Sequence, residues 1–174
     1  SAQFGPQSFD CVVSQFGFEY CQPSIASELI TSWLKQDGKV LFLVHTRESQ
    51  ISKEVRYTLE QMRMAEESAL LVVIYRLLER LDQLSIKGQK PDDQCEDLRQ
   101  LINITSDELG TVAQDLPDPL FLKSFVSFSL GFFSQERSHI PPSVKLDNLT
   151  LFSNQLLQHR ARSLQQAEAA LDDE

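Results

Sequence analysis

Glycine and proline are absent from the whole stretch between Gly38 and Gly88. A segment without these two residue types contains no strong helix breaker, and most of it (residues 49–84) reads as one long helix. Its centre, residues 69–75, carries apolar side chains all around the helix axis, which predicts that neighbouring segments enclose it. Residues 66–68, a polar Glu-Glu-Ser triplet, are interpreted either as a bend or as an exposed turn of the same helix.

Signatures of catalysis and of cofactor binding are also missing. No glycine-rich loop precedes a helix, so nothing indicates a cradle for phosphate groups. The three cysteines lie far apart without a CxxC pair, and the three histidines have no second metal ligand at a spacing such as i, i+4. The sequence therefore predicts no metal site and no cofactor, and we expect a protein that is not an enzyme.

The chain lacks an excess of basic residues. It has 16 Lys and Arg against 25 Asp and Glu, for a formal net charge of -9. Binding to phosphates needs a positive surface, so we expect no nucleic acid as partner, and charge alone disfavours docking on anionic lipid. No apolar run reaches the roughly 18 residues of a membrane span, and no signal peptide is visible. With an odd number of cysteines, these absences predict an intracellular protein, cytoplasmic or nuclear, and the missing first methionine indicates a piece of a longer chain.

A small β element stands near the N-terminus. Residues 9–21 alternate aromatic side chains with small or polar ones, and residues 40–44 form a short apolar run with branched side chains. Both segments read as strands. Between them Pro23 can begin a helix, and Gly38 can end it. This order is interpreted either as one parallel crossover unit or as an antiparallel pair beside a helical body.

Further helices account for the rest of the chain. We expect one to begin at residues 91–93, another at a capping Ser106, a Phe-rich helix over residues 120–133, and a last helix over residues 144–171. The predicted fold class is mainly α, an irregular helical bundle around one long central helix with a small N-terminal β element, and α+β is the alternative. The predicted domains are a flexible tail (1–8), one globular α-rich domain (9–142) and a C-terminal helix that packs on it or extends from it (143–174).

A stripe of phenylalanines is the most distinctive local pattern. Phe121, Phe125, Phe128 and Phe132 follow one another at spacings of 4, 3 and 4, so they share one face of a helix. Such a stripe is typical of a core helix, and it also fits a groove that docks a partner's helix or a lipid-facing helix. Serines in place of basic residues on the opposite face weaken the lipid interpretation.

The expected function is protein–protein interaction, as a scaffold domain of a larger intracellular protein or complex, with no catalysis. In this interpretation a helix of the partner protein lies in a groove of this domain. The partner can also be a second copy of the chain. One alternative is an enzyme with a site at the strand end near His45, because ligands often gather at such ends. Another is lipid-surface binding through the Phe-rich helix. The candidate partner-binding residues are Phe125, Phe128, Phe132, Leu156, Leu164 and Leu171.

Overall fold

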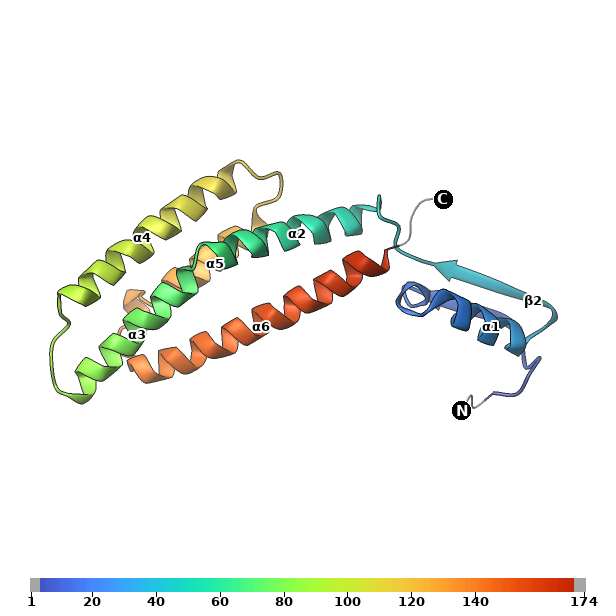
Figure 1. The fold of residues 1–174 in the computed structure, drawn as a ribbon, viewed down its shortest axis with the longest axis horizontal. Helices are drawn as coiled ribbons and strands as arrows, with labels where there is room; N and C mark the ends of the chain where they lie inside the picture. Colours follow the sequence, from blue (N-terminus) through green and yellow to red (C-terminus); the bar gives the residue numbers. More distant parts are fainter. Residues whose placement is uncertain (1–3, 171–174) are drawn as a thin grey trace. The chain divides into compact units, whose positions relative to one another are not determined.

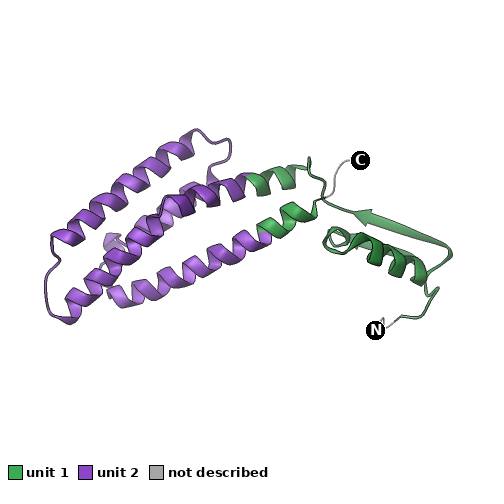
Figure 2. Ribbon diagram, in the orientation of Figure 1, with its two compact units in different colours: residues 1–56, 163–174 green, residues 57–162 purple. Residues whose placement is uncertain are grey.

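The computed structural model describes residues 4–170 and divides the chain into two compact units (Figure 2). Unit 1 consists of residues 1–56 with 163–174, and unit 2 consists of residues 57–162. The domain bounds predicted from the sequence, one globular domain over residues 9–142, stay a prediction. Two long helices, α2 and α6, contribute residues to both units, so the boundary falls inside helices and leaves no break in composition that the sequence could reveal.

Unit 1 contains a strand–helix–strand crossover. Its two strands pair in parallel as a two-stranded sheet, which agrees with the parallel form of the predicted crossover. The aromatic ring of Phe18 stacks on that of Phe42, with ring centroids 4.2 Å apart, and so connects the turn after the first strand to the second. The elements are β1 (Phe9–Gln15), η1 (Phe18–Tyr20), α1 (Pro23–Trp33) and β2 (Leu34–Leu43) (Figure 1).

The helix of this crossover ends earlier than predicted. Helix α1 stops at Trp33 and β2 follows at once, whereas the sequence placed the stop at Gly38. The strand bulges over residues 35–38, where its register with β1 shifts. A Cβ atom on Gly38 would come within 2.8 Å of the Leu34 side chain. Glycine at this position therefore permits a close approach within the bulge and does not end a helix.

The segment predicted as a flexible tail folds back onto unit 1 from residue 4 onward. The ring of Phe4 lies edge-on to Phe9 at 5.2 Å and to Trp33 at 5.9 Å. The backbone N–H of Gln7 donates a hydrogen bond to the carbonyl of Ser32 at 2.9 Å. Residues 1–3 lie outside the described part of the chain.

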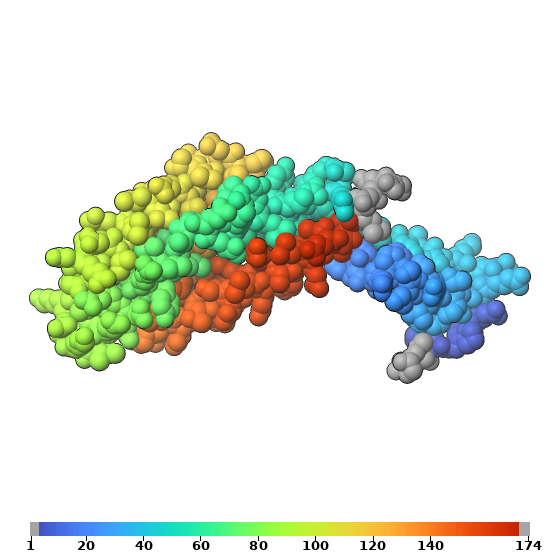
Figure 3. All heavy atoms as spheres, in the orientation of Figure 1, coloured from blue at the N-terminus to red at the C-terminus, as the bar shows by residue number. Residues whose placement is uncertain are grey.

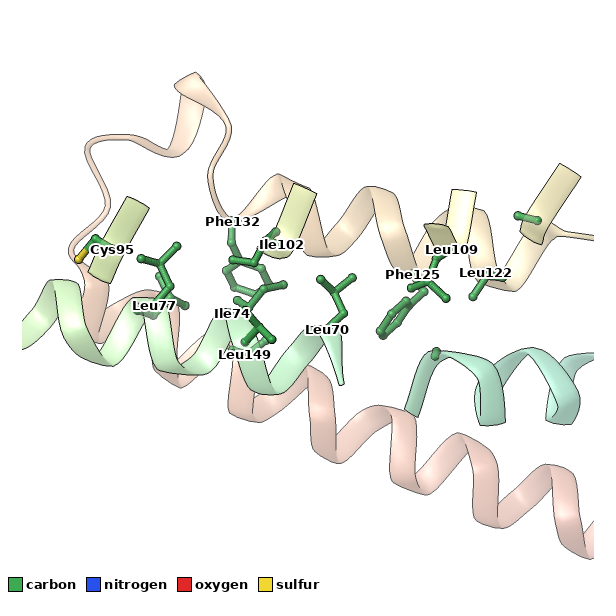
Figure 4. Packing of buried hydrophobic residues seen from close by; sticks show 14 of the residues in the cluster. Leu70, Ile74, Leu77, Cys95, Ile102, Leu109, Leu122, Phe125, Phe132 and Leu149 are labelled. Carbon is green, nitrogen blue, oxygen red and sulfur yellow. The ribbon is translucent and has the colours of Figure 1, made fainter. Parts of the chain in front are cut away.

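Unit 2 is helical, and α3 packs against α4 and α5. The buried cluster takes side chains from five helices, α2 to α6, and Figure 4 shows many of them converging between the ribbons. Its members include Leu70, Ile74, Leu77, Ile102, Leu109, Leu122, Phe125 and Leu149. The helical elements that contribute to this unit are α2 (Gln50–Glu67), α3 (Leu70–Ile86), α4 (Asp93–Gln114), α5 (Leu120–Gly131), η2 (Gln135–Arg137) and α6 (Pro142–Ala169).

The predicted central helix is two helices. Helix α2 ends at Glu67, and Ala69 adopts the left-handed conformation with φ 54° and ψ 16° before α3 begins. The hydroxyl of Ser68 donates to the carbonyl of Ala65 at 2.7 Å and accepts from the N–H of Leu70 at 3.3 Å. These bonds satisfy backbone groups that the break leaves without helical partners. Of the two interpretations of residues 66–68, the bend is therefore the one that applies.

Two predicted helices, in contrast, are one. Helix α4 runs without a break, and Ser106 lies in its interior with 3% of its surface exposed, so it is not a cap. Apolar residues on the buried face continue across this position, with Ile102 before it and Leu109 after it, and their burial carries the helix onward. The true cap is Asp92, whose side chain accepts a hydrogen bond from the N–H of Cys95 at 3.2 Å.

No helix among residues 4–170 is long and apolar enough to cross a membrane.

Candidate functional site

One face of the two-stranded sheet is the clearest uncovered apolar surface of unit 1. Val13 in β1 stands opposite Leu41 in β2, and these side chains are 65% and 63% exposed. Leu43 lies two residues further along β2, therefore on the same face, and Cys11 lies on that face of β1. Both are exposed. We call these four residues the open sheet face.

Parallel strands are normally covered on both faces, because the helices that connect them pack over the sheet. A two-stranded sheet is also marginally stable when nothing else packs on it. Within residues 4–170 each strand has one neighbour, so each leaves an outer edge of backbone N–H and C=O groups without ladder partners. Unit 1 thus presents an apolar face together with two strand edges.

The interior of unit 1 is small. Helix α1 has no buried residue, and its Ile25 and Leu29, one turn apart, are 51% and 42% exposed. None of the buried residues described in this unit has a large apolar side chain. They are Glu19, His45, Ser52, Ser163 and Ala170.

His45, the residue at the centre of the enzyme alternative, is buried and held by two neighbours. Its Nδ1 lies 2.9 Å from Oε1 of Glu19, and the same oxygen accepts the backbone N–H of His45 at 3.3 Å. The ring of Phe16 stacks on the imidazole at a centroid distance of 4.3 Å. The other carboxylate oxygen of Glu19 is buried without a hydrogen-bond partner among the described residues.

This acid–histidine pair connects η1 to the segment that follows β2. A carboxylate beside an imidazole is also the arrangement that orients a general base. A general base must, however, reach the group that it deprotonates. His45 is only 9% exposed, and no hydroxyl or thiol of residues 4–170 is hydrogen-bonded to its ring. As described, the pair therefore holds the turn and presents no nucleophile.

The phenylalanine stripe faces the chain's own helix α6. Phe152 of α6 stacks on Phe128 at 4.0 Å and on Phe125 at 6.3 Å between ring centroids. Phe125 and Phe132 are 3% and 2% exposed, whereas Phe128 keeps 36% of its surface. Helix α6 lies alongside α2 and α3 (Figure 3), and a pocket of about 220 Å³ remains between them, lined in part by Phe121, Phe125 and Leu156. Phe125 and Phe132 are therefore core residues of unit 2, and binding of a partner through this stripe stays a prediction.

The predicted leucines of the last helix fall in different places. Leu156 is half-buried against the core of unit 2, and Leu164 is 36% exposed. Leu171 lies outside the described residues. The most exposed leucines of α6 are Leu151 and Leu157, at 58% and 60%, and the sequence did not single them out.

Sequence reasoning also missed the open sheet face. Val13 and Leu41 were placed in strands, but their exposure depends on what packs on the sheet. One signal was available, because the sequence offers two strands for a parallel sheet and no third strand or second helix to cover them.

The cysteines and other potential metal ligands remain apart. Cys11 and Cys21 are exposed free thiols, and Cys95 is a buried one. Burial raises the pKa of the Cys95 thiol, which makes it a poor nucleophile. Across residues 4–170, no three His, Cys, Asp or Glu side chains gather as ligands for one ion.

Comparison with known proteins gives no assignment. The chain matches no model of a known protein family, and neither curated proteins nor solved structures contain a significant match. The surfaces of the molecule are therefore what indicate its function.

Proposed function

We propose that the chain is a protein-interaction domain of a larger intracellular assembly, and that its partner covers the open sheet face of unit 1. The observation that carries this proposal is the exposure of Val13 and Leu41, which stand side by side on an uncovered parallel sheet. The free thiols of the chain are compatible with a reducing compartment.

Burial supplies the driving force for such a contact. Covering a Val or Leu side chain completely contributes about 1.5–3 kcal/mol, and the open sheet face offers several such side chains next to one another. The outer edges of β1 and β2 can also accept a strand from the partner through main-chain hydrogen bonds. The fitting partner is therefore a protein that brings an apolar surface, an extended segment, or both. A second copy of this chain is one such protein.

The test replaces apolar contact by charge without disturbing strand pairing. In the variant Val13→Lys/Leu41→Glu the new charges stand directly opposite each other, so they form a cross-strand ion pair that maintains the register. The matched control is Val72→Lys/Tyr75→Glu, which changes two residues of α3 that are 52% and 45% exposed. Both variants and the parent serve as baits in extract of the source cells, and circular dichroism verifies the fold of each.

The expected result is a stoichiometric partner that the parent and the control retain and that the sheet variant binds more than about tenfold more weakly, as expected for residues at the centre of an interface. Light scattering after size exclusion determines whether that partner is a second copy of the chain. A partner retained by the sheet variant, or no partner for a folded parent, contradicts the proposal.

A further inference from the structure

A cavity of about 610 Å³ lies within unit 2, lined by residues of α3, α4, the end of α5 and the start of α6. This volume falls in the range of pockets that enclose small molecules. Leu84 and Ile102, which are 6% and 2% exposed, belong to its apolar wall. Further apolar wall residues are Leu81, Leu130, Phe133 and Ile140.

Lys145 lines this cavity as a cation without a partner among the described residues. The residue as a whole is 9% exposed, and its side chain makes no hydrogen bond or ion pair in that part of the chain, although water still reaches its ammonium group. Lysines are almost never buried unless they are paired. Lys145 also stands in the first turn of α6, which carries no acidic residue and where the helix dipole already provides positive potential.

The other charged groups around the cavity are cations as well. Arg99 lines the cavity, and its ion pair with Glu96, at 3.8 Å, is a loose surface contact. Arg137 and Lys145 together line an adjoining hollow of about 450 Å³. Burial, and after it the charge of Arg137, lower the pKa of Lys145. No carboxylate lines the 610 Å³ cavity, although the chain as a whole has a net charge of -9.

We propose that this cavity binds a small amphiphilic carboxylate, whose acid group pairs with the ammonium of Lys145 and whose apolar body lies against Leu84, Ile102 and Phe133. An unpaired lysine that lines a cavity together with six apolar residues fits a ligand with one charged end and a hydrocarbon body. Lys145 and Arg99 are the two cations in the lining, and the apolar side chains beside them favour a ligand with one acid group and a hydrocarbon body over a polyanion such as a nucleotide. This proposal is independent of the open sheet face.

The test titrates the full chain with decanoate below its micelle threshold. 1-Decanol provides the same hydrocarbon body without the acid, and acetate provides the acid without the body. Calorimetry measures affinity, and methyl NMR signals of Leu84 and Ile102 report whether the ligand enters this cavity. The variant Lys145→Met removes the charge and retains the length of the side chain, and Lys123→Met, at an exposed position of α5, is the matched control. Lys145→Gln is a second variant that remains polar.

Decanoate is expected to bind the parent and the control, to shift both methyl signals, and to bind both Lys145 variants at least about tenfold more weakly, as loss of a charge-assisted hydrogen bond predicts. Acetate and 1-decanol are expected to bind far more weakly than decanoate. The proposal is overturned if decanoate does not bind, if 1-decanol binds equally well, or if a folded Lys145 variant retains the parent's affinity.

Discussion

Gln61 is a polar residue with a structural role that no sequence pattern announces. It is 3% exposed, and its side-chain amide connects α2 to the beginning of α5. Its Oε1 accepts the N–H of Leu122 at 3.0 Å, and its Nε2 donates to the carbonyl of Asp118 at 2.7 Å. The N-cap residue of α5, Pro119, has no side-chain acceptor, and among the described residues Asp118 Oδ1 accepts only the N–H of Leu120, so Gln61 satisfies a further backbone donor at this helix start, that of Leu122.

Replacing this amide by an apolar side chain should destabilise unit 2. Gln61→Leu leaves the N–H of Leu122 buried without an acceptor, and we expect the free energy of unfolding to fall by about 1–3 kcal/mol. Urea denaturation followed by circular dichroism measures the change. The matched control is Gln158→Leu at an exposed position of α6, where a shift within about 0.5 kcal/mol is expected. Equal shifts in the two variants would show that the bridge contributes nothing.

The phenylalanine stripe shows which properties of single residues the sequence predicts and which it does not. The spacing of the stripe correctly placed Phe125 and Phe128 on one side of a helix. Both rings stack on Phe152 of α6, yet they are 3% and 36% exposed, because Phe125 belongs to the buried cluster of unit 2 and Phe128 does not. Exposure depends on the element opposite, which periodicity along one helix does not contain.

At the scale of elements, Ala69 divides a segment that composition describes as one helix. Helix propensity is favourable on both sides, and no glycine or proline marks the break. The left-handed conformation of Ala69 is unfavourable for any residue with a Cβ atom. Packing of α3 on α4 and α5 evidently outweighs this local preference, because burial is a property of the whole bundle.

A glycine at this junction should therefore stabilise the chain. Ala69→Gly removes the contact between Cβ and backbone in the left-handed conformation, and we expect the free energy of unfolding to rise by about 0.5–1 kcal/mol. The control Ala161→Gly, at an exposed position inside α6, should lower it by a similar amount, since glycine weakens a continuous helix. If Ala69→Gly destabilises as Ala161→Gly does, the segment is one continuous helix in solution.

The type of a secondary-structure element was predictable where the spacing of its apolar residues is regular over many positions. The residues at which elements begin and end were not predictable in this way. The Phe-rich helix and the last helix appear where spacing and the proline breaks placed them. The stop assigned to Gly38 and the start assigned to Ser106 were wrong, because the first residue serves a strand bulge and the second lies on a buried helix face. Both residue types have several uses, and only the packing around them selects one.

At the scale of the whole molecule, the two units differ in how much apolar surface they bury. The fully buried large side chains that the structure describes, from Leu70 to Leu149, belong to unit 2. Unit 1 keeps the valines and leucines of its open sheet face in water. The sequence predicted the strand–helix–strand order of unit 1. It did not predict that unit 1 buries less apolar surface than unit 2, because the order of the strands does not say which sheet faces remain uncovered.

Hydrogen exchange should reveal the difference directly. With the chain alone, amides of β1 and β2 are expected to exchange at least about tenfold faster than those in the middle of α3, after correction for intrinsic rates, because a sheet without a covering layer opens at a lower free energy. Mass spectrometry of exchanged peptides measures both regions in one sample, with α4 as an internal reference. Equal protection of β1 and α3 would contradict the marginal stability inferred for unit 1.

The two outer edges of the sheet also affect how readily the protein aggregates at high concentration. An edge that accepts a partner's strand accepts a strand from any other chain, including a misfolded copy. Lys39 on β2 opposes such additions through its charge, whereas Lys35 is ion-paired with Asp10 of β1, and the exposed Val13 and Leu41 favour them. If the proposed partner covers these edges, we expect copies made in excess of that partner to be the ones that aggregate as fibres.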